Sequence, residues 1–527
     1  MTDALDSIRP DHELRLDALV RELGEGAALE GDPTVVVTGV HHDSRRVQPG
    51  DLFVARKGAG ADGVKYVQSA RERGARAVLA ARATLTSEDV GLPVVSVPEV
   101  MEGLALAASA VYGHPSFGLE VVGVTGTNGK TTTTHLLRSA IDAACGAPRC
   151  GLIGTVAHAF GDMRVDAAHT TPEADDLARL MLAMKRAGAT HVAMEVSSIA
   201  LALGRTRAVR FTVAALTNLT QDHLDFHGTM EAYGRAKEDL FLRYGPHTSV
   251  ICVDHDFGRA LAAKIEGPCV RVSARVEGEA DVKPTRLNLT SRGIAGEVRT
   301  PEGTFALRSP LVGAHNVENL AVVLGCLSAL GLDVPKGLAA LASDVGAPGR
   351  LERCDEPGDD VSVLVDYAHT PDALARVLDA VRAVAKGRVV CVFGCGGDRD
   401  PQKRGPMGAA VAERADVALV TSDNPRTEDP SAIAAPIVAA VSASSLSRIS
   451  EAELASRRGY LVELDRGRAI DAAIAHAAPG DVVVVAGKGH EDYQIVGTEK
   501  RHFDDREHAR AALERRRQGG QSRRAGN

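Results

Sequence analysis

The chain has 527 residues, 44% of them hydrophobic, and a formal net charge of −8 at pH 7. This length exceeds what one hydrophobic core supports, so three domains of ordinary size are expected. The negative charge argues against a nucleic-acid-binding protein, which usually carries a broad basic face.

The cysteines and the N-terminus bear on the cellular compartment. The eight cysteines are scattered and form no C-x-x-C pair, so neither a zinc site nor a disulfide framework is expected, and a reducing compartment is indicated. The first twenty residues lack the apolar segment of a secretory signal, and no run of eighteen apolar residues could span a membrane. We therefore expect a cytoplasmic monomer that acts on small molecules and binds neither nucleic acid nor membranes.

The first predicted domain covers residues 1–117. Short apolar runs separated by glycine and proline predict strands over 34–40, 51–56, 75–82 and 92–97. Turn-forming residues at 113–120 predict a linker into the next domain.

The second and third predicted domains cover residues 118–345 and 346–527. In the second, near-continuous apolar runs at 120–126, 190–198 and 211–219 are typical of buried parallel strands. In the third, runs at 361–369, 387–397, 415–426 and 481–490 are each followed by a helical stretch. The predicted fold class is α/β, with a central P-loop ATPase-type parallel sheet and a C-terminal Rossmann-like doubly wound domain. The basic tail at 514–527 is expected to be disordered.

A glycine-rich loop lies between a predicted strand and a predicted helix at Gly126-Thr127-Asn128-Gly129-Lys130-Thr131. The common phosphate-loop spelling, G-x-x-x-x-G-K-[ST], would require a glycine where Val124 stands. Backbone N–H groups of such a loop and the following helix N-terminus bind phosphate, and Lys130 adds a positive charge. A hydroxyl at Thr131 or Thr132 can hold Mg²⁺. Nucleotide binding is predicted, outside the ordinary motor and GTPase loops.

Acidic residues follow two of the predicted central strands. Glu195 ends one strand, and Asp222, His223, Asp225 and His227 follow another. Hard oxygen ligands with one imidazole suit Mg²⁺ or Mn²⁺ beside phosphates. The alternative is a polar loop with helix-capping aspartates; the position just past a strand end favours a metal site.

A second glycine signal occurs at Gly394 and Gly396, again after a predicted strand. A dinucleotide-binding fingerprint requires a third glycine where Arg399 stands, so NAD binding is disfavoured.

These motifs together resemble the Mur ligases and their folylpolyglutamate synthetase relatives, over nearly the whole chain. Besides the phosphate loop, segments that fit in order lie at 195–198, 217–227, 232–241, 313–324, 349–352, 365–374, 393–400, 423–426 and 486–494. The resemblance implies an ATP-dependent amide ligase that adds diaminopimelate to UDP-N-acetylmuramoyl-L-alanyl-D-glutamate through an acyl phosphate, in peptidoglycan precursor synthesis. It implies ATP as co-substrate and Mg²⁺ as cofactor.

The resemblance also implies the roles of individual residues. Catalysis is implied for Lys130, Lys237, His223 and Glu195, and metal binding for Thr131, Glu195, His223 and a carbamylated Lys237. ATP binding is implied for Gly126, Thr127, Asn128, Gly129, Lys130, Thr131, Thr132, Asn316, Arg350 and Asp366. Contacts to the UDP-muramoyl dipeptide are implied for Ser44, Arg45, Thr170, Thr171, Ser197 and Arg205. Diaminopimelate contacts are implied for Arg399, Asp423, Asn424, Pro425, Arg426, Gly487 and Glu491. Without the resemblance, Lys237 would be predicted to be an exposed helix lysine.

Three alternatives differ in testable ways. For a lysine-adding ligase of the same family, the substrate lysine has no distal carboxylate for Arg426 to bind. A folate ligase would not share the first domain. A P-loop NTPase switch would have the ordinary phosphate loop and would not need the motifs of the third domain. A non-catalytic binding protein would not need Lys130, Glu195, His223 and Lys237 together.

Overall fold

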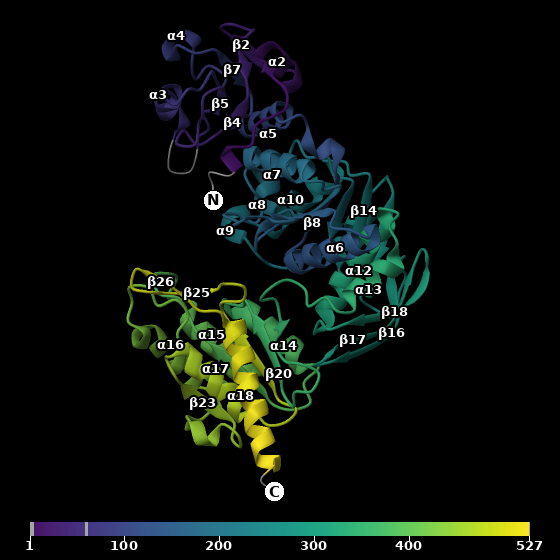
Figure 1. Ribbon diagram of the computed structural model, residues 1–527, viewed down its shortest axis with the longest axis vertical. Helices are drawn as coiled ribbons and strands as arrows, with labels where there is room; N and C mark the ends of the chain where they lie inside the picture. Colours follow the sequence, from purple (N-terminus) through teal and green to yellow (C-terminus); the bar gives the residue numbers. More distant parts are fainter. Residues whose placement is uncertain (1–4, 58–61, 526–527) are drawn as a thin grey trace. The chain divides into compact units, whose positions relative to one another are not determined.

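The computed structural model describes residues 5–57 and 62–525 (Figure 1). They form two compact units, each described here by itself. Unit 1 comprises residues 1–283, 300–303 and 319–337, and unit 2 comprises residues 284–299, 304–318 and 338–527.

Unit 1 begins with a five-stranded sheet in the order β2-β7-β6-β5-β4, in which β4 to β7 are parallel and β2 is antiparallel at the edge. Its strands are β2 (Ala28–Glu30), β4 (Gly39–His41), β5 (Asp51–Val54), β6 (Ala77–Ala81) and β7 (Val94–Val97). Beside it lie α2 (Leu16–Leu23), α3 (Val67–Glu72), α4 (Ser87–Val90), α5 (Val100–Val111) and the small pair β1 (Leu14–Arg15) and β3 (Val36–Val37). Three of the four predicted strand segments are confirmed as β5, β6 and β7, whereas the segment predicted at 34–40 is divided between β3 and β4, which belong to different sheets. The predicted linker contains the 3-10 turn η2 (Pro115–Gly118).

The central sheet of unit 1 has eight strands in the order β11-β10-β9-β12-β8-β13-β14-β15. They are β8 (Glu120–Thr125), β9 (Cys150–Ile153), β10 (His158–Phe160), β11 (Met163–Val165), β12 (His191–Glu195), β13 (Val213–Leu216), β14 (Thr248–Cys252) and β15 (Cys269–Val272). The strands from β9 to β15 in this order pair in parallel, whereas β10 and β11 are antiparallel. The three apolar segments predicted as buried parallel strands are therefore confirmed as the adjacent strands β12, β8 and β13.

Strand register brings the candidate site together. Glu195 pairs with Val124, and Leu216 pairs with Thr125, so β12, β8 and β13 end at the same edge of the sheet. The loops that follow these ends carry the candidate residues. Helices of this region are α6 (Lys130–Cys145), α7 (Ala174–Arg186), α8 (Ser198–Ala202), α9 (Leu224–His227), α10 (Met230–Leu242) and α11 (Asp256–Ala262). Residues of α7, α10 and α11 pack in one apolar core, and α6 lies on the opposite side of β8 (Figure 1).

Residues 284–337 contribute alternately to the two units. This part of the chain holds the three-stranded sheet β16 (Lys283–Thr290), β17 (Gly293–Thr300) and β18 (Gly303–Ser309), followed by α12 (Ala314–Ala329) and α13 (Val334–Leu341). The boundary between the units falls within α12, directly after Glu318.

Unit 2 contains a six-stranded sheet in the order β19-β20-β24-β21-β22-β23, parallel except for the edge strand β19. Its strands are β19 (Glu352–Arg353), β20 (Ser362–Asp366), β21 (Val389–Phe393), β22 (Val417–Val420), β23 (Gly459–Val462) and β24 (Val482–Ala486). One apolar core includes α14 (Pro371–Arg382), α15 (Arg404–Arg414) and α16 (Pro430–Ser442), and another includes α17 (Arg466–His476) and α18 (Asp505–Ala525). Because helices cover both faces, the predicted doubly wound sheet is confirmed. The hairpin β25 (Tyr493–Val496) and β26 (Glu499–His502) follows β24.

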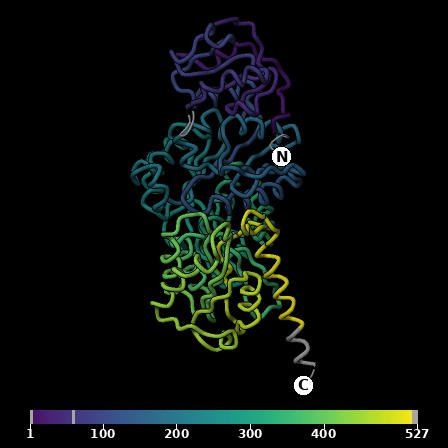
Figure 2. The backbone as a smooth tube through the Cα atoms, turned by 90° about the vertical axis from the view of Figure 1, so that its left-hand side faces the viewer, coloured from purple at the N-terminus to yellow at the C-terminus, as the bar shows by residue number. Residues whose placement is uncertain are grey.

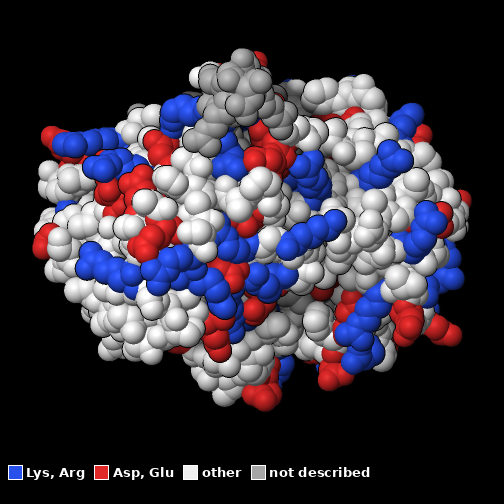
Figure 3. All heavy atoms as spheres, turned by 90° about the horizontal axis from the view of Figure 1, so that it is seen from below, with Lys and Arg blue, Asp and Glu red and all other residues white. Residues whose placement is uncertain are grey.

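The prediction of a disordered basic tail is wrong for its described part. Helix α18 spans Asp505–Ala525, and its yellow part is seen in Figure 2. Arg515 pairs with Asp471, Arg516 with Asp360 and Arg517 with Asp359. Ion pairing with acids brought close by the fold explains this order, which composition alone could not indicate. Figure 3 shows basic and acidic side chains interspersed on the drawn face.

Two further features concern the compartment. All eight cysteines are free. Within residues 5–57 and 62–525, no helix combines the length and the apolar character needed to cross a bilayer.

We predict that the start of α18 is held by one buried ion pair. Arg466 and Asp505 are both fully buried, and two hydrogen bonds of 2.7 and 2.6 Å join them. Asp505→Asn leaves the guanidinium buried without its counter-charge and should lower the free energy of unfolding by about 3–5 kcal/mol in urea denaturation. The control Asp471→Asn breaks the exposed pair with Arg515 and should cost less than about 1 kcal/mol. Equal effects of the two substitutions would contradict this assignment.

Candidate active site

The phosphate loop connects β8 to α6 in a conformation that depends on two glycines. Gly126 has φ +148° and Gly129 has φ +86°, a region that side chains disfavour. A Cβ on Gly126 would lie 1.9 Å from Thr217 Oγ1, so this position also has no room for a side chain. Thr127 N donates to Asn218 O at 2.9 Å, and Thr217 Oγ1 donates to Asn128 O at 2.7 Å. The loop after β13 thus fixes the shape of the phosphate loop.

The setting of the loop matches the prediction from the sequence. Strand β8, the glycine turn and the 16-residue helix α6 follow one another, and Lys130 is the first residue of α6. A helix N-terminus directs backbone N–H groups and the positive end of the helix dipole toward the loop. This arrangement can bind the phosphates of a nucleotide.

Two lysine ammonium groups meet at one backbone carbonyl of the loop. Lys130 Nζ and Lys237 Nζ each lie 2.9 Å from Gly126 O. Lys237 projects from α10 and is 1% exposed. Burial, together with the charge of Lys130, lowers the pKa of Lys237 well below its ordinary value. The expectation from residue type alone, an exposed helix lysine, is wrong because α10 packs this side chain beneath the loop.

Glu195 is placed by the end of β12 and is 1% exposed. Thr131 Oγ1 donates to Glu195 Oε2 at 3.0 Å. Thr155 N donates to Oε1 at 2.8 Å, and Thr155 Oγ1 donates to Oε2 at 3.2 Å. The carboxylate and the Thr131 hydroxyl together supply hard oxygen donors beside the phosphate loop, which suits Mg²⁺. Thr155 escaped the sequence analysis because it lies in a loop with no motif of its own.

Tyr233, which the sequence analysis also missed, lies near three of the candidate residues. Its hydroxyl lies 3.1 Å from Thr127 Oγ1, and Lys237 Nζ lies 4.5 Å from its ring centre. The rings of His223 and Tyr233 have centroids 6.2 Å apart. Burial raises the pKa of Tyr233 to about 12, so it stays a neutral phenol. Its position four residues before Lys237 on one helix face is the signal that could have indicated it.

His223 lies at the rim of this group. It precedes α9 with φ +51°, and its side chain is 43% exposed, with Asp222 Oδ2 3.5 Å from its Nε2. The structure therefore places Glu195, Thr131 and Lys237 in buried positions near the loop and His223 at the surface of the same region.

Four of the six candidate contacts to the UDP-muramoyl dipeptide lie near Glu195. Thr171 Oγ1 donates to the Glu195 backbone carbonyl at 2.8 Å and lies 3.5 Å from Ser197 Oγ. Arg205 donates to Thr171 O at 3.1 Å, and Thr170 Oγ1 lies 3.0 Å from Thr155 Oγ1.

Ser44 and Arg45 lie elsewhere in unit 1, after β4. Ser44 is buried, and the Arg45 guanidinium pairs with Asp43 at 2.7 Å with its side chain 84% exposed. Among the described residues, no hydrogen bond joins these two to the cluster beside Glu195.

Three candidate nucleotide contacts belong to unit 2. Asp366 ends β20 and accepts hydrogen bonds from Leu351 N at 2.7 Å and Ala368 N at 2.8 Å, while burial raises its pKa. The guanidinium of Arg350 lies 5.0 Å from the Tyr367 ring centre, adjacent to this acid. Asn316, in the first turn of α12, donates to Val312 O at 2.8 Å.

The segment Asp423–Arg426 follows the end of β22, as predicted, and is fastened to the β25–β26 hairpin. Ile495 N donates to Asn424 Oδ1 at 3.0 Å, and Arg426 N donates to Ile495 O at 3.0 Å. Gln494 Nε2 donates to Asp423 O at 2.7 Å. Arg426 has φ +51°, and its guanidinium donates to Gly397 O at 2.7 Å.

Gly394 of the second glycine signal and the nearby Gly397 serve close packing of two loops. A Cβ on Gly394 would lie 2.2 Å from Thr421 O, and one on Gly397 would lie 2.0 Å from Pro425 O. These glycines therefore let the loop after β21 lie against the loop after β22, a role that requires no dinucleotide. Arg399 is exposed at the end of this loop.

Glu491 and a lysine that the sequence analysis missed complete this region. Asn424 Nδ2 donates to Glu491 Oε2 at 3.1 Å. Lys488 Nζ donates to Asn424 Oδ1 at 2.9 Å and lies 3.3 Å from Asp423 Oδ1. Burial and the neighbouring Asp423 carboxylate raise the pKa of Glu491. Gly487, with φ +125°, precedes this lysine at the end of β24.

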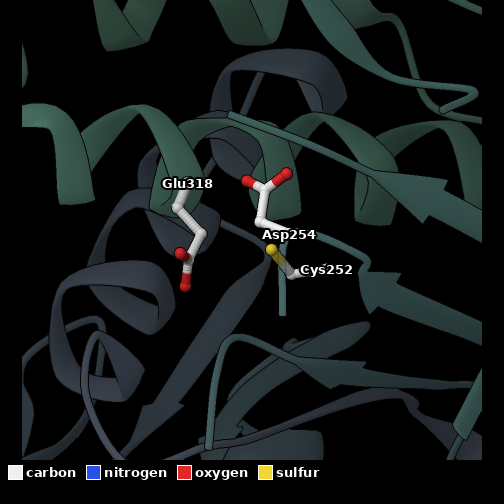
Figure 4. Close-up of side chains that lie close together, drawn as sticks. All are labelled: Cys252, Asp254 and Glu318. Atoms are coloured by element: carbon white, nitrogen blue, oxygen red, sulfur yellow. The ribbon is translucent and has the colours of Figure 1, made fainter. Parts of the chain in front are cut away.

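Figure 4 draws Cys252 and Asp254 of unit 1 and Glu318 of unit 2, whose side chains are of types that can bind a metal ion. The Asp254 carboxylate already accepts hydrogen bonds from Ser273 Oγ at 2.5 Å and Ala274 N at 2.7 Å. Cys252 is buried, and Asp254 has hydrogen-bond partners of its own, so both residues have a structural role in unit 1. Glu318 is the last residue of α12 that belongs to unit 2.

Comparisons with known proteins define the class. Three family models match the chain in order: the Mur ligase family catalytic domain at residues 36–112, the Mur ligase middle domain at 124–327, and the Mur ligase glutamate ligase domain at 349–489. The chain belongs to the Mur ligase family and is an enzyme of the ligase class.

Relatives within the family point to one branch. The chain is 45% identical over 489 residues to a UDP-N-acetylmuramoyl-L-alanyl-D-glutamate–2,6-diaminopimelate ligase of Gloeobacter violaceus, covering 93% of this chain and 96% of the relative. It is 42% identical over 513 residues to the ligase of that name from Streptomyces coelicolor, covering 96% and 98%. A solved structure of a ligase of that name has 30% identity and a TM-score of 0.71, covering 96% of this chain and all of that one.

Proposed function

We propose that this chain joins diaminopimelate to UDP-N-acetylmuramoyl-L-alanyl-D-glutamate at the expense of ATP, in peptidoglycan precursor synthesis. The observation that carries the proposal is the pair of lysines, Lys130 and Lys237, directed at Gly126 O in a phosphate loop beside the buried Glu195. The ammonium of Lys130 at the N-terminus of α6 suits the transfer of a phosphoryl group, and the buried Lys237 beside it is available for modification. The sequence similarity to the named relatives supports the choice of substrates.

The proposed reaction proceeds through an acyl phosphate. A carboxylate oxygen of the substrate's D-glutamate attacks the γ-phosphorus of ATP, and the bond to the β-phosphate oxygen breaks to release ADP. The amino group of diaminopimelate then attacks the acyl carbon, loses a proton and expels phosphate, which leaves an amide. The ammonium of Lys130 holds the phosphate oxygens and offsets their charge during the first step.

Mg²⁺ fits the oxygen donors of the site. Thr131 and Glu195 would hold it, with His223 and a carbamylated Lys237 as the further proposed ligands. When bound, the ion neutralises charge on the phosphate oxygens. Carbamylation requires a neutral amine, and the lowered pKa of Lys237 favours that form.

The third amino acid is proposed to bind to unit 2. Diaminopimelate carries a distal carboxylate that lysine lacks, and the Arg426 guanidinium matches a carboxylate as a two-pronged donor. Asp423 and Glu491 would receive the distal ammonium, with Asn424, Pro425 and Gly487 shaping the pocket and Arg399 assisting at the carboxylates.

The remaining assignments belong to the same proposal. Asn316, Arg350 and Asp366 would contact the base and ribose of ATP. Ser44, Arg45, Thr170, Thr171, Ser197 and Arg205 would contact the UDP-muramoyl dipeptide. The domains would be residues 1–117, 118–345 and 346–527, and the use of ATP and a UDP-linked substrate supports a cytoplasmic enzyme.

The test is ADP release by the purified protein with the UDP-muramoyl dipeptide and either diaminopimelate or lysine. Release that depends on diaminopimelate is expected. Turnover with lysine in preference to diaminopimelate would contradict the proposed third residue.

We predict that Lys130→Ala abolishes ADP release, because it removes an ammonium from the phosphate loop. The fold should be kept, since Lys130 is only half-buried at the start of α6. The control Lys264→Ala removes an exposed lysine that pairs with Glu238 and should keep wild-type turnover. Near-normal turnover by folded Lys130→Ala would contradict the ATP site.

We predict that Lys237→Ala is nearly inactive and that short-chain carboxylic acids or bicarbonate partly restore ADP release by supplying the missing oxygens. Lys130→Ala serves as the control, because it lacks a cation and should not respond to these anions. A crystal structure with Mg²⁺ and CO₂ that showed an unmodified Lys237 amine would count against carbamylation.

We predict that Arg426→Ala raises the KM for diaminopimelate at least tenfold and barely changes the KM for ATP. A charge-assisted contact of this kind contributes about 1.5–3 kcal/mol, which corresponds to roughly ten- to a hundredfold. Arg501→Ala is the matched control, because this arginine is exposed on the neighbouring hairpin and pairs with Glu499. Wild-type constants in Arg426→Ala would refute its role in recognition.

A further inference from the structure

A buried lysine behind the proposed amino-acid pocket has no role in the function described so far. Lys488 directly follows Gly487 at the end of β24, and its side chain is fully buried. Burial of a charge without partners is costly, so a buried ammonium requires a complete set of acceptors. An ammonium has three N–H donors.

Two hydrogen bonds and an ion pair from separate segments surround Lys488. Its Nζ donates to Asn424 Oδ1 at 2.9 Å and forms an ion pair with Asp423 Oδ1 at 3.3 Å, both in the turn after β22. It also donates to Tyr493 O at 2.6 Å, in the segment after β24. Lys488 therefore joins the turn that carries Arg426 to the segment that carries Glu491.

The ammonium also determines how Asn424 is turned. Because Lys488 can only donate, the carbonyl end of the Asn424 amide must face it, and the NH₂ end is directed to Glu491 Oε2 at 3.1 Å. Ile495 N donates to the same Asn424 oxygen at 3.0 Å, which supports this orientation.

Charge gives a second reason for a lysine at this position. Asp423 and Glu491 both approach the ammonium, at 3.3 and 3.9 Å, and each carboxylate would otherwise face the other across a buried region. The positive charge of Lys488 offsets the negative charge of the two groups where they approach each other.

We infer that Lys488 is a positioning residue for the third amino acid, which clamps the Asp423–Arg426 turn to the Glu491 segment and so presets the pocket. The inference rests on the proposed function. It predicts that Lys488→Met, which keeps the length of the side chain and removes the charge, weakens amino-acid binding selectively.

The experiment measures KM for all three substrates in wild type, Lys488→Met and Lys500→Met. Lys488→Met should raise the KM for diaminopimelate at least fivefold and leave the KM for ATP and for the UDP-muramoyl dipeptide within twofold. Lys500 is an exposed lysine on the β25–β26 hairpin, and its Nζ lies 3.8 Å from the Tyr493 ring centre. Lys500→Met should therefore leave all three KM values within twofold.

A smaller rise in the KM for diaminopimelate by folded Lys488→Met, or an equal rise for all substrates, would overturn the inference. Circular dichroism and the thermal midpoint establish folding; if the methionine variant fails to fold, Lys488→Gln is measured against the same thresholds. Wild type is assayed first. If it used lysine instead of diaminopimelate, the proposed function would fail, and the same comparison with lysine would still test the role of Lys488 in the amino-acid pocket.

Discussion

The candidate site of unit 1 is organised around one carbonyl oxygen, Gly126 O, that accepts hydrogen bonds from two lysines. Lys130 Nζ and Lys237 Nζ each lie 2.9 Å from it, and burial together with the charge of Lys130 lowers the pKa of Lys237 and so favours its neutral amine. Close approach of Thr217 Oγ1 leaves no room for a side chain on Gly126, and the Tyr233 ring lies 4.5 Å from Lys237 Nζ. The ammonium of Lys130 and the N-terminus of α6 together suit an anion, and the Mur ligase family uses ATP.

In unit 2, the candidate amino-acid site brings carboxylates together, whereas the site of unit 1 brings lysines together. Close contacts at Gly394 and Gly397 bring the loop after β21 against the turn at 423–426, and the hairpin fastens that turn from another side. Asp423 and Glu491 then approach each other, and the buried Lys488 offsets their charge. Unit 1 thus gathers lysines beside its phosphate loop, and unit 2 gathers carboxylates around a buried lysine.

Several strands and candidate residues could be predicted, because buried parallel strands appear in the sequence as apolar runs. Apolar runs indicated β8, β12 and β13, and polar residues just past their ends indicated Glu195 and the phosphate loop. The motif at 423–426 was likewise expected after a buried strand and lies after β22. Thr155, Tyr233 and Lys488 could not be found in the same way, since each acts through a partner more than thirty residues away or through burial that residue type does not indicate.

The sequence by itself determined the α/β class, the strand-loop-helix setting of Lys130 and the family resemblance, because periodicity and local motifs are properties of contiguous residues. Only the tertiary structure decided that Lys237 is buried, although residue type predicted exposure. It also decided that the basic tail is helical through Arg517, where acids from distant segments pair with its arginines. Burial and charge pairing depend on which segments the fold brings together, and that information lies in no single stretch of the chain.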